Sequence, residues 1–248
     1  MSNVSFAALA SVPAYRVVER RIRTAVLDGT IKPGSLLPTE DTLADQFGVT
    51  RSTVREAIRS LENSGLIDRG PRRRLRIALP THNMLDDAFH RAIVLHSIKF
   101  REIWEAHMAI EPMTAELAAE RASPKLLKAL DDNLARTKAV LNRTEELVAA
   151  DIEFHALVAE ASGNRALMLA RDPLSRFLFP SYEVVIRKLD PGRRLLVAHT
   201  NIVAAIKMHD GAAARSWMDK HIRDFRRGYE LAGQNPERTI KAGIPQGG

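Results

Sequence analysis

Two short segments with helical periodicity are joined by a single glycine, and this arrangement constrains the fold more than any other feature of the chain. The first segment, EDTLADQF, covers residues 40–47, and the second runs from residue 51 to 63, where Gly65 ends it. Gly48 lies between them and tolerates the left-handed backbone that a tight turn needs. Two short helices joined in this way form a helix-turn-helix.

The segments on either side complete a small domain. A helix is expected over residues 14–27, and the stretch DGTIKPGSLLPTE, with two Gly and two Pro, ends it and leads to the next helix start. After Gly65, apolar residues alternate with arginines on the far side of a Gly70-Pro71 turn. That alternation predicts a β-hairpin, which would be the wing of a winged helix-turn-helix over residues 14–79.

Beyond this domain the chain shows only helical periodicity, so we expect a mainly α protein. Residues 80–83 are interpreted as a linker and 84–231 as an all-helical bundle, with a flexible start at 1–13 and a disordered tail at 232–248. The expected helices cover residues 84–97, 100–121, 124–142, 145–162, 165–188 and 192–231. The last two are expected to break near Pro173, Pro180 and residues 210–211.

Charge and composition narrow the class of protein. The chain has 248 residues and a net charge of +7, and residues 1–80 alone hold 13 Lys and Arg against 8 Asp and Glu. A basic front end favours a polyanionic partner such as DNA or RNA, although the same excess is also compatible with a solvated surface. With no cysteine, no leader and no apolar run long enough to span a bilayer, we expect no membrane association and a cytoplasmic location.

The third helix carries the candidate nucleic-acid contacts. Its apolar stripe consists of Val54, Ala57, Ile58 and Leu61. Arg51, Ser52 and Arg55 therefore point outward near the start of the helix, where a helix entering the major groove meets base edges. Thr50, Thr53 and the local backbone amides are expected to meet phosphates. The alternative is an exposed amphipathic helix with solvated arginines.

The stretch PGSLLPTEDTLADQFGVTRSTVREAIRSLENSGLI resembles the signature of the GntR family of bacterial regulators. The resemblance implies that Arg51 and Arg55 read bases of double-stranded DNA and that the wing enters the minor groove. Two departures are present: Asp41 stands where the family often has a basic residue, and Arg74 where the wing tip usually has Gly. We expect Arg72, Arg73 and Arg74 to contact phosphates or the minor groove.

The second half places ionisable residues on apolar helix faces. Asp151 and His155 share one stripe, one turn apart, and His199 and His221 lie on the stripes of two later segments. An unpaired Asp buried in this way costs several kcal/mol. A divalent cation with open coordination positions would satisfy all four, and three imidazoles with one carboxylate suit Zn, Ni, Mn or Fe. For any one residue alone, a hydrogen-bonded core role is the simpler alternative.

The segments DIEFH, AHTNIVAAI and MDKHI, with EPMTAELAAERA before them, resemble the metal-binding version of the FCD domain, the helical effector domain of the FadR branch of GntR regulators. The resemblance implies that Asp151, His155, His199 and His221 are the metal ligands. It also implies a bundle of six or more helices, a homodimer, and a small organic acid bound at the metal. The two-fold symmetry of a homodimer predicts an inverted repeat as the DNA site.

His107 marks a further departure. The family usually carries an arginine at this position to grip the carboxylate of the effector. His107 lies on the inward stripe of its helix, so we expect it either to face the effector or to be an ordinary core residue. An imidazole is a weaker partner for a carboxylate than a bidentate guanidinium.

Three functions therefore compete. The first is a transcription regulator controlled by a small carboxylic acid at a metal site. The second is a metalloenzyme, since open positions on a metal ion can activate water, although the sequence offers no motif for a general base. The third is a regulator for which the metal ion itself is the signal.

Overall fold

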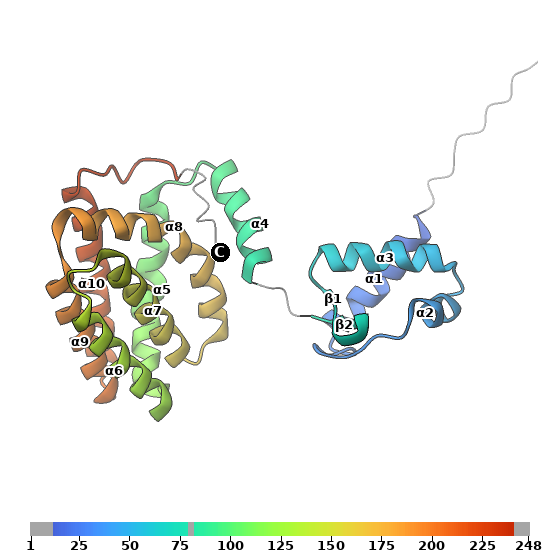
Figure 1. The fold of residues 1–248 in the computed structure, drawn as a ribbon, viewed down its shortest axis with the longest axis horizontal. Helices are drawn as coiled ribbons and strands as arrows, with labels where there is room; N and C mark the ends of the chain where they lie inside the picture. Colours follow the sequence, from blue (N-terminus) through green and yellow to red (C-terminus); the bar gives the residue numbers. More distant parts are fainter. Residues whose placement is uncertain (1–11, 79–81, 241–248) are drawn as a thin grey trace, which may run out of the picture. The chain divides into compact units, whose positions relative to one another are not determined.

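The computed structural model describes residues 12–78 and 82–240, without the side chains of Arg72 and residues 82–87. The chain divides into two compact units, residues 1–87 and 88–248 (Figure 1). Residues 1–11 of the expected flexible segment and residues 80–81 of the expected linker lie outside the described residues. Residues 82 and 83 are not linker, because α4 (His82–Leu95) begins there.

The first unit is a winged helix-turn-helix, as predicted. It contains α1 (Ala14–Leu27), α2 (Glu40–Phe47), α3 (Arg51–Asn63) and the strands β1 (Ile67–Arg69) and β2 (Leu75–Ile77). The strands pair antiparallel, with Ile67 opposite Ile77. Apolar residues of all five elements form one small core, with Val54, Ala57, Ile58 and Leu61 at 0% exposure.

Local chemistry explains where these helices begin and end. The hydroxyls of Thr39 and Thr50 accept hydrogen bonds from the backbone amides of Thr42 and Thr53, which caps α2 and α3. Gly48 ends α2 with φ 65°, the left-handed conformation that most residues avoid. The turn that the sequence predicts is therefore fixed by residues within it.

The residue with left-handed backbone at the tip of the wing lies one position earlier than expected. A short 3₁₀ turn over Pro71–Arg73 joins the two strands, and the left-handed residue in it is Arg73, with φ 57°. Arg74 is extended, with φ −71°. The position that favours glycine is therefore 73 rather than 74.

The second unit is all helical apart from one isolated backbone bridge. It contains α5 (Phe100–Arg121), α6 (Pro124–Ala139), α7 (Thr144–Ala161), α8 (Arg165–Leu189), α9 (Gly192–Lys207) and α10 (Gly211–Leu231). In Figure 1, α5 runs through the middle of this unit, and it contacts α7, α8, α9 and α10. The alanines Ala115, Ala118 and Ala119 on α5 are fully buried, which lets these helices approach closely.

α8 is continuous, which corrects the predicted breaks near Pro173 and Pro180. Each proline removes one backbone hydrogen bond. Both lie inside a 25-residue helix whose Pro173, Ser175 and Leu178 are buried against the rest of the unit, so tertiary packing compensates for the loss. The predicted break at residues 210–211 is present, between α9 and α10.

The expected disorder of residues 232–248 is corrected for residues 232–240. The Ile240 amide donates to the carbonyl of Ile98, and the Phe100 amide donates to that of Arg238. Glu237 forms ion pairs with Lys99 and Arg101 at 2.8 Å. These contacts fasten the segment to the start of α5, while residues 241–248 lie outside the described residues.

Across the described residues, no helix is long and apolar enough to cross a membrane.

Candidate functional site

The start of α3 presents a group of hydroxyls and arginines. Thr50 caps the helix, and its Oγ1 lies 2.8 Å from Ser52 Oγ and 2.9 Å from Thr53 Oγ1. Arg51 and Arg55 are exposed on the same end of the helix. Unpaired backbone amides and hydroxyls at a helix start favour phosphate oxygens.

Two acidic residues of α2 lie against these arginines. Glu40 Oε2 is 3.4 Å from Arg55 Nε and 3.7 Å from Arg51 Nε, and Asp41 Oδ1 is 3.2 Å from Arg51 Nε. Both arginines remain about half exposed, at 56% and 48% of their side chains. Carboxylates so placed hold the guanidinium groups at the helix surface while leaving them free to exchange partners in water.

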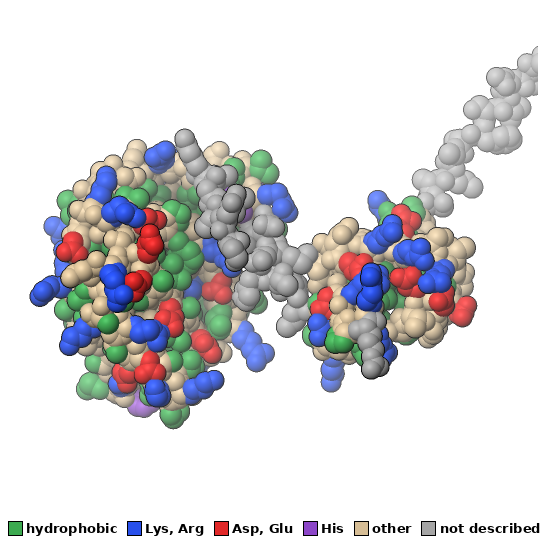
Figure 2. Space-filling view, viewed as in Figure 1, with side chains coloured by type: hydrophobic (Ala, Val, Ile, Leu, Met, Phe, Trp, Pro, Cys, Tyr) green, Lys and Arg blue, Asp and Glu red, His purple; other side chains and the backbone are tan. Residues whose placement is uncertain are grey.

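The wing adds further basic groups. Arg73 and Arg74 are exposed, whereas the side chain of Arg72 lies outside the described residues. Arg76 instead pairs across the hairpin with Asp68, at 2.6 Å. Figure 2 shows acidic and basic side chains interspersed on the visible face of this unit, so its net positive charge is not a uniform basic patch there.

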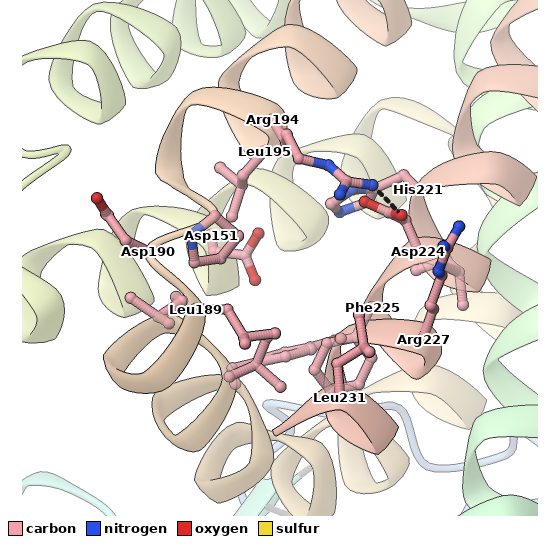
Figure 3. A pocket seen from close by; sticks show the side chains of 16 residues that line it. Asp151, Leu189, Asp190, Arg194, Leu195, His221, Asp224, Phe225, Arg227 and Leu231 are labelled. Carbon is pink, nitrogen blue, oxygen red and sulfur yellow. Dashed lines mark hydrogen bonds and ion pairs between the residues drawn. The ribbon is translucent and has the colours of Figure 1, made fainter. Parts of the chain in front are cut away.

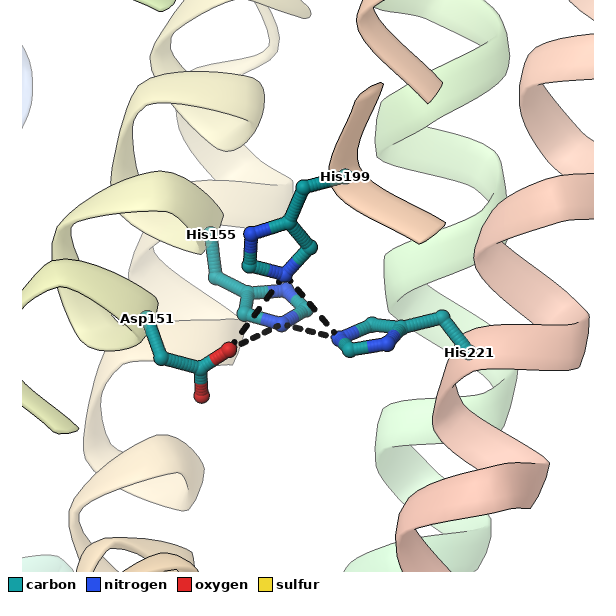
Figure 4. Close-up of side chains that lie close together, drawn as sticks. All are labelled: Asp151, His155, His199 and His221. Atoms are coloured by element: carbon teal, nitrogen blue, oxygen red, sulfur yellow. Dashed lines mark hydrogen bonds and ion pairs between the residues drawn. The ribbon is translucent and has the colours of Figure 1, made fainter. Parts of the chain in front are cut away.

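The four residues predicted to bind a metal come together in the second unit. Asp151 and His155 project from α7, His199 from α9 and His221 from α10 (Figure 4). One ligand atom from each lies within 4.8 Å of all the others. Asp151, His155 and His199 are at most 3% exposed, and His221 is partly buried.

Neighbouring side chains orient the rings. The Nδ1 of His155 lies 3.0 Å from Glu111 Oε2, which favours a proton on Nδ1 and leaves the Nε2 lone pair directed at the cluster. His199 stacks on Phe154, with the ring centroids 3.6 Å apart. The imidazoles are therefore held in place before any ligand binds.

The donor atoms have the spacing that one metal ion requires. The Nε2 atoms of His155 and His199 lie 3.1 and 3.3 Å from that of His221, and Asp151 Oδ1 lies 3.3 Å from His199 Nε2. Two nitrogens bound to one ion at about 2.1 Å, roughly 90 to 110° apart, are separated by about 3.0 to 3.4 Å. Asp151 Oδ1 is also buried without a hydrogen-bond donor. The residues present therefore fit a divalent cation.

The ionisation of the cluster suits the same role. Burial lowers the pKa of His221 well below its ordinary value, and burial likewise lowers the pKa of His199. Burial opposes charge on His155 too, but Glu111 outweighs it and raises the pKa of that ring. Burial raises the pKa of Asp151, yet the imidazoles outweigh it and the pKa is lowered overall. The shifts at His199, His221 and Asp151 favour the neutral imidazoles and the carboxylate that bind metals, whereas His155 must give up its Nε2 proton to do so.

Glu111 and Arg171 belong to the site and were missed by the sequence reasoning. Glu111 is 1% exposed and accepts a 2.6 Å hydrogen bond from Arg171 Nε, besides its contact with His155. Arg171 is itself 4% exposed. The position of Glu111 four residues after His107 on an inward face was a usable signal, whereas nothing near Arg171 indicated its partner 60 residues away.

His107 is buried, at 1% exposure, with Nδ1 3.5 Å from Glu111 Oε1 and no hydrogen-bond partner for either ring nitrogen. It faces Glu111 Oε1, whereas His155 contacts the other oxygen of that carboxylate. His107 is not among the residues that line the pocket described next.

A pocket of about 150 Å³ opens beside the metal cluster, among α8, α9 and α10 (Figure 3). Asp151 and His221 form part of its wall, so the cluster is accessible from it. Much of the remaining wall is apolar and includes Val185, Ile186, Leu189, Leu195, Phe225 and Leu231. A small molecule in this pocket could reach the metal ligands.

A winged helix-turn-helix joined to a helical unit with a buried ligand site defines a DNA-binding transcription regulator with an effector domain. Residues 14–77 match the model of the gntR family of bacterial regulatory proteins, and residues 102–224 match the FCD domain. The chain belongs to the GntR family, and its second unit carries an FCD domain.

Individual relatives agree with this assignment. The transcriptional regulator YdhC of Bacillus subtilis is 32% identical over 62% of this chain and 63% of its own length. LutR of the same organism, another HTH-type transcriptional regulator, is 26% identical over 79% of this chain and 92% of its own. The structure of Streptococcus agalactiae GntR covers 86% of this chain and 99% of its own with a TM-score of 0.61 and 25% identity. These relatives are transcription regulators rather than enzymes, which argues against the metalloenzyme hypothesis.

Proposed function

We propose that the operator affinity of this regulator is controlled by a small organic acid bound together with a divalent transition metal in the FCD domain. The observation that carries the proposal is the convergence of Asp151, His155, His199 and His221 on one point, with a buried carboxylate oxygen that lacks a donor.

The donor set suits Zn, Ni, Mn or Fe, because imidazole and carboxylate together are common ligands of each. Four protein ligands from three helices would leave room in the coordination shell of an ion that prefers five or six ligands. The ion would supply an open position for a carboxylate. The pocket bounded by Asp151 and His221 supports an acid with an apolar body in that place.

On the DNA side, we propose that Arg51 and Arg55 read base edges in the major groove. Thr50, Ser52 and Thr53 would bind phosphates, and Arg72, Arg73 and Arg74 would contact the phosphates or minor groove beside them. A homodimer bound to an inverted repeat follows from the usual match between two-fold protein symmetry and palindromic half-sites.

The metal-sensor alternative uses the same ligands but needs no acid. The pocket favours the acid, because an ion acting alone as the signal does not require an apolar cavity beside it.

Elemental analysis of the purified protein tests the metal. We expect about one transition-metal ion per chain in the wild type and a large loss in His199→Ala, because that variant removes one of four ligands. His209→Ala is a matched control, since His209 lies outside the cluster and its ring bonds to the Ala119 carbonyl. A wild-type protein that holds no such metal, and takes none up when it is supplied, contradicts the proposal.

A further inference from the structure

Arg194 lies at the edge of the pocket, next to the metal cluster. It belongs to α9, and its guanidinium pairs with Asp224 of α10 close to the ring of His221 (Figure 3). Arg194, Asp224 and His221 also line a second, more open hollow. The ion pair therefore stands between two hollows, beside a metal ligand.

Few cations are available to an acid in this pocket. Among the described residues that line it, Arg194 and Arg227 carry permanent positive charge. In Figure 3 the guanidinium of Arg194 lies next to His221, while that of Arg227 lies farther from His221. Arg171 is bound to Glu111, and His107 does not line the pocket. Arg194 is thus the cation best placed to hold a carboxylate near the metal.

Asp224 already shows that a carboxylate fits against this guanidinium. The pair is solvent-exposed, at 68% of the Arg194 side chain and 42% of that of Asp224. Exposed pairs of this kind contribute little stability, so a competing carboxylate can replace Asp224 at small cost. A guanidinium can bind such a ligand through two parallel hydrogen bonds, which an imidazole cannot.

We propose that Arg194 binds the carboxylate of the effector in exchange for Asp224, and that the effector is a small acid with an apolar body. The apolar body would contact Val185, Leu189 and Phe225. This inference rests on the proposed effector site, and it places the carboxylate-binding group on α9 rather than at His107, which does not line the pocket.

The exchange would also couple binding of the acid to the contact between α9 and α10. Without ligand, the Arg194–Asp224 pair joins α9 to α10, the helices that carry His199 and His221. Binding of an acid would open this link while adding a bond to the ligand. The acid would thereby replace a weak contact between α9 and α10 by its own contacts with α8, α9 and α10, which the metal alone does not make.

Two substitutions with opposite expected effects test the exchange. Calorimetric titration of metal-loaded protein with acetate, butyrate and pentanoate should show affinity rising with chain length, by up to roughly fourfold per methylene. Arg194→Gln should weaken binding roughly tenfold, because it removes a charge-assisted hydrogen bond. Asp224→Asn should tighten binding by up to about fivefold, because it removes the competitor.

Arg223→Gln and Asp219→Asn are the matched controls. These residues form an exposed ion pair within α10 at 2.7 Å and do not line the pocket, so neither change should alter binding. Butyramide, which has the shape of butyrate but no charge, should not bind measurably.

The outcomes separate this inference from the proposed function. Metal-loaded Arg194→Gln that binds acids as tightly as wild type overturns the inference and leaves the metal site standing. Weakening by both Arg194→Gln and Asp224→Asn also overturns it, because the pair would then be purely structural. So does a wild type that binds none of the acids. Acid binding that depends on Arg194 in protein without metal supports the inference and contradicts the proposed function.

Discussion

Both units place carboxylates beside basic groups, but in opposite surroundings. In the DNA-binding unit, Asp41 faces Arg51 with 64% and 56% of the two side chains exposed. In the FCD domain, Asp151 faces His199 with 4% and 0% exposed. Water screens the first pair, so its partners can be exchanged for those on DNA. Asp151 and His199 are almost completely removed from solvent, so the buried carboxylate needs a fixed partner such as a metal ion.

The largest loss of stability should come from removing Glu111, the buried carboxylate that contacts Arg171 and His155. Glu111→Ala removes the buried carboxylate that pairs with Arg171 and leaves this guanidinium the more exposed Asp172, which should cost up to about 3 to 5 kcal/mol of unfolding free energy. It also removes the acceptor of His155 Nδ1, and loss of such an orienting partner weakens metal binding by about 10- to 100-fold. Urea denaturation and metal titration measure the two effects.

Glu237→Ala is the exposed counterpart. Glu237 pairs with Lys99 and Arg101 while 50% of its side chain is exposed, so its loss should cost about 1 kcal/mol or less. Equal losses of stability in the two variants would remove the distinction between buried and exposed carboxylates. Glu111→Gln, which keeps the shape, allows the metal titration if the alanine variant does not fold.

The next effect concerns the exposed arginines as DNA contacts. Arg51→Ala and Arg55→Ala should each cost about 1 to 3 kcal/mol of specific operator binding, the usual contribution of a bidentate base contact. Arg59→Ala, a change farther along the exposed face of α3, serves as a control with a smaller effect. If the operator is held equally tightly by all of these proteins at matched salt, α3 is not the recognition helix.

The smallest expected effect is a change in operator affinity on removing the charge of Asp41, the exposed carboxylate beside Arg51. Asp41→Asn keeps the side-chain shape but removes the charge that competes for Arg51. Operator affinity should rise by up to about fivefold, and its dependence on salt should become steeper. Weaker binding would mean that Asp41 positions Arg51 rather than competing with DNA for it. Titrations at several salt concentrations distinguish the two.

The sequence predicted features that depend on local patterns. The stripe through Val54 and Leu61 and the Gly48 turn are set by neighbouring residues, and the predicted helices of the first unit match the observed ones. The buried cluster was also predictable, because Asp151 and His155 interrupt an apolar stripe where a polar residue is costly.

Features that depend on distant packing were not predictable. The bond between Glu111 and Arg171 joins residues 60 positions apart, and only the docking of α8 on α5 brings them together. The same packing keeps α8 helical through Pro173 and Pro180. The neighbours of Arg194 likewise come from a different helix, so no periodicity could indicate its place beside His221.

The central claim is that a ligand in the FCD domain changes the DNA affinity of a unit that contains none of its binding residues. The most direct test is an operator titration of one metal-loaded preparation with and without saturating acid, repeated with His199→Ala. We expect the acid to change operator affinity by about 5- to 150-fold in the wild type, the usual range of such coupling. The variant should bind the operator normally but respond little. An unchanged operator affinity in metal-loaded wild type saturated with an acid that it binds would contradict the account.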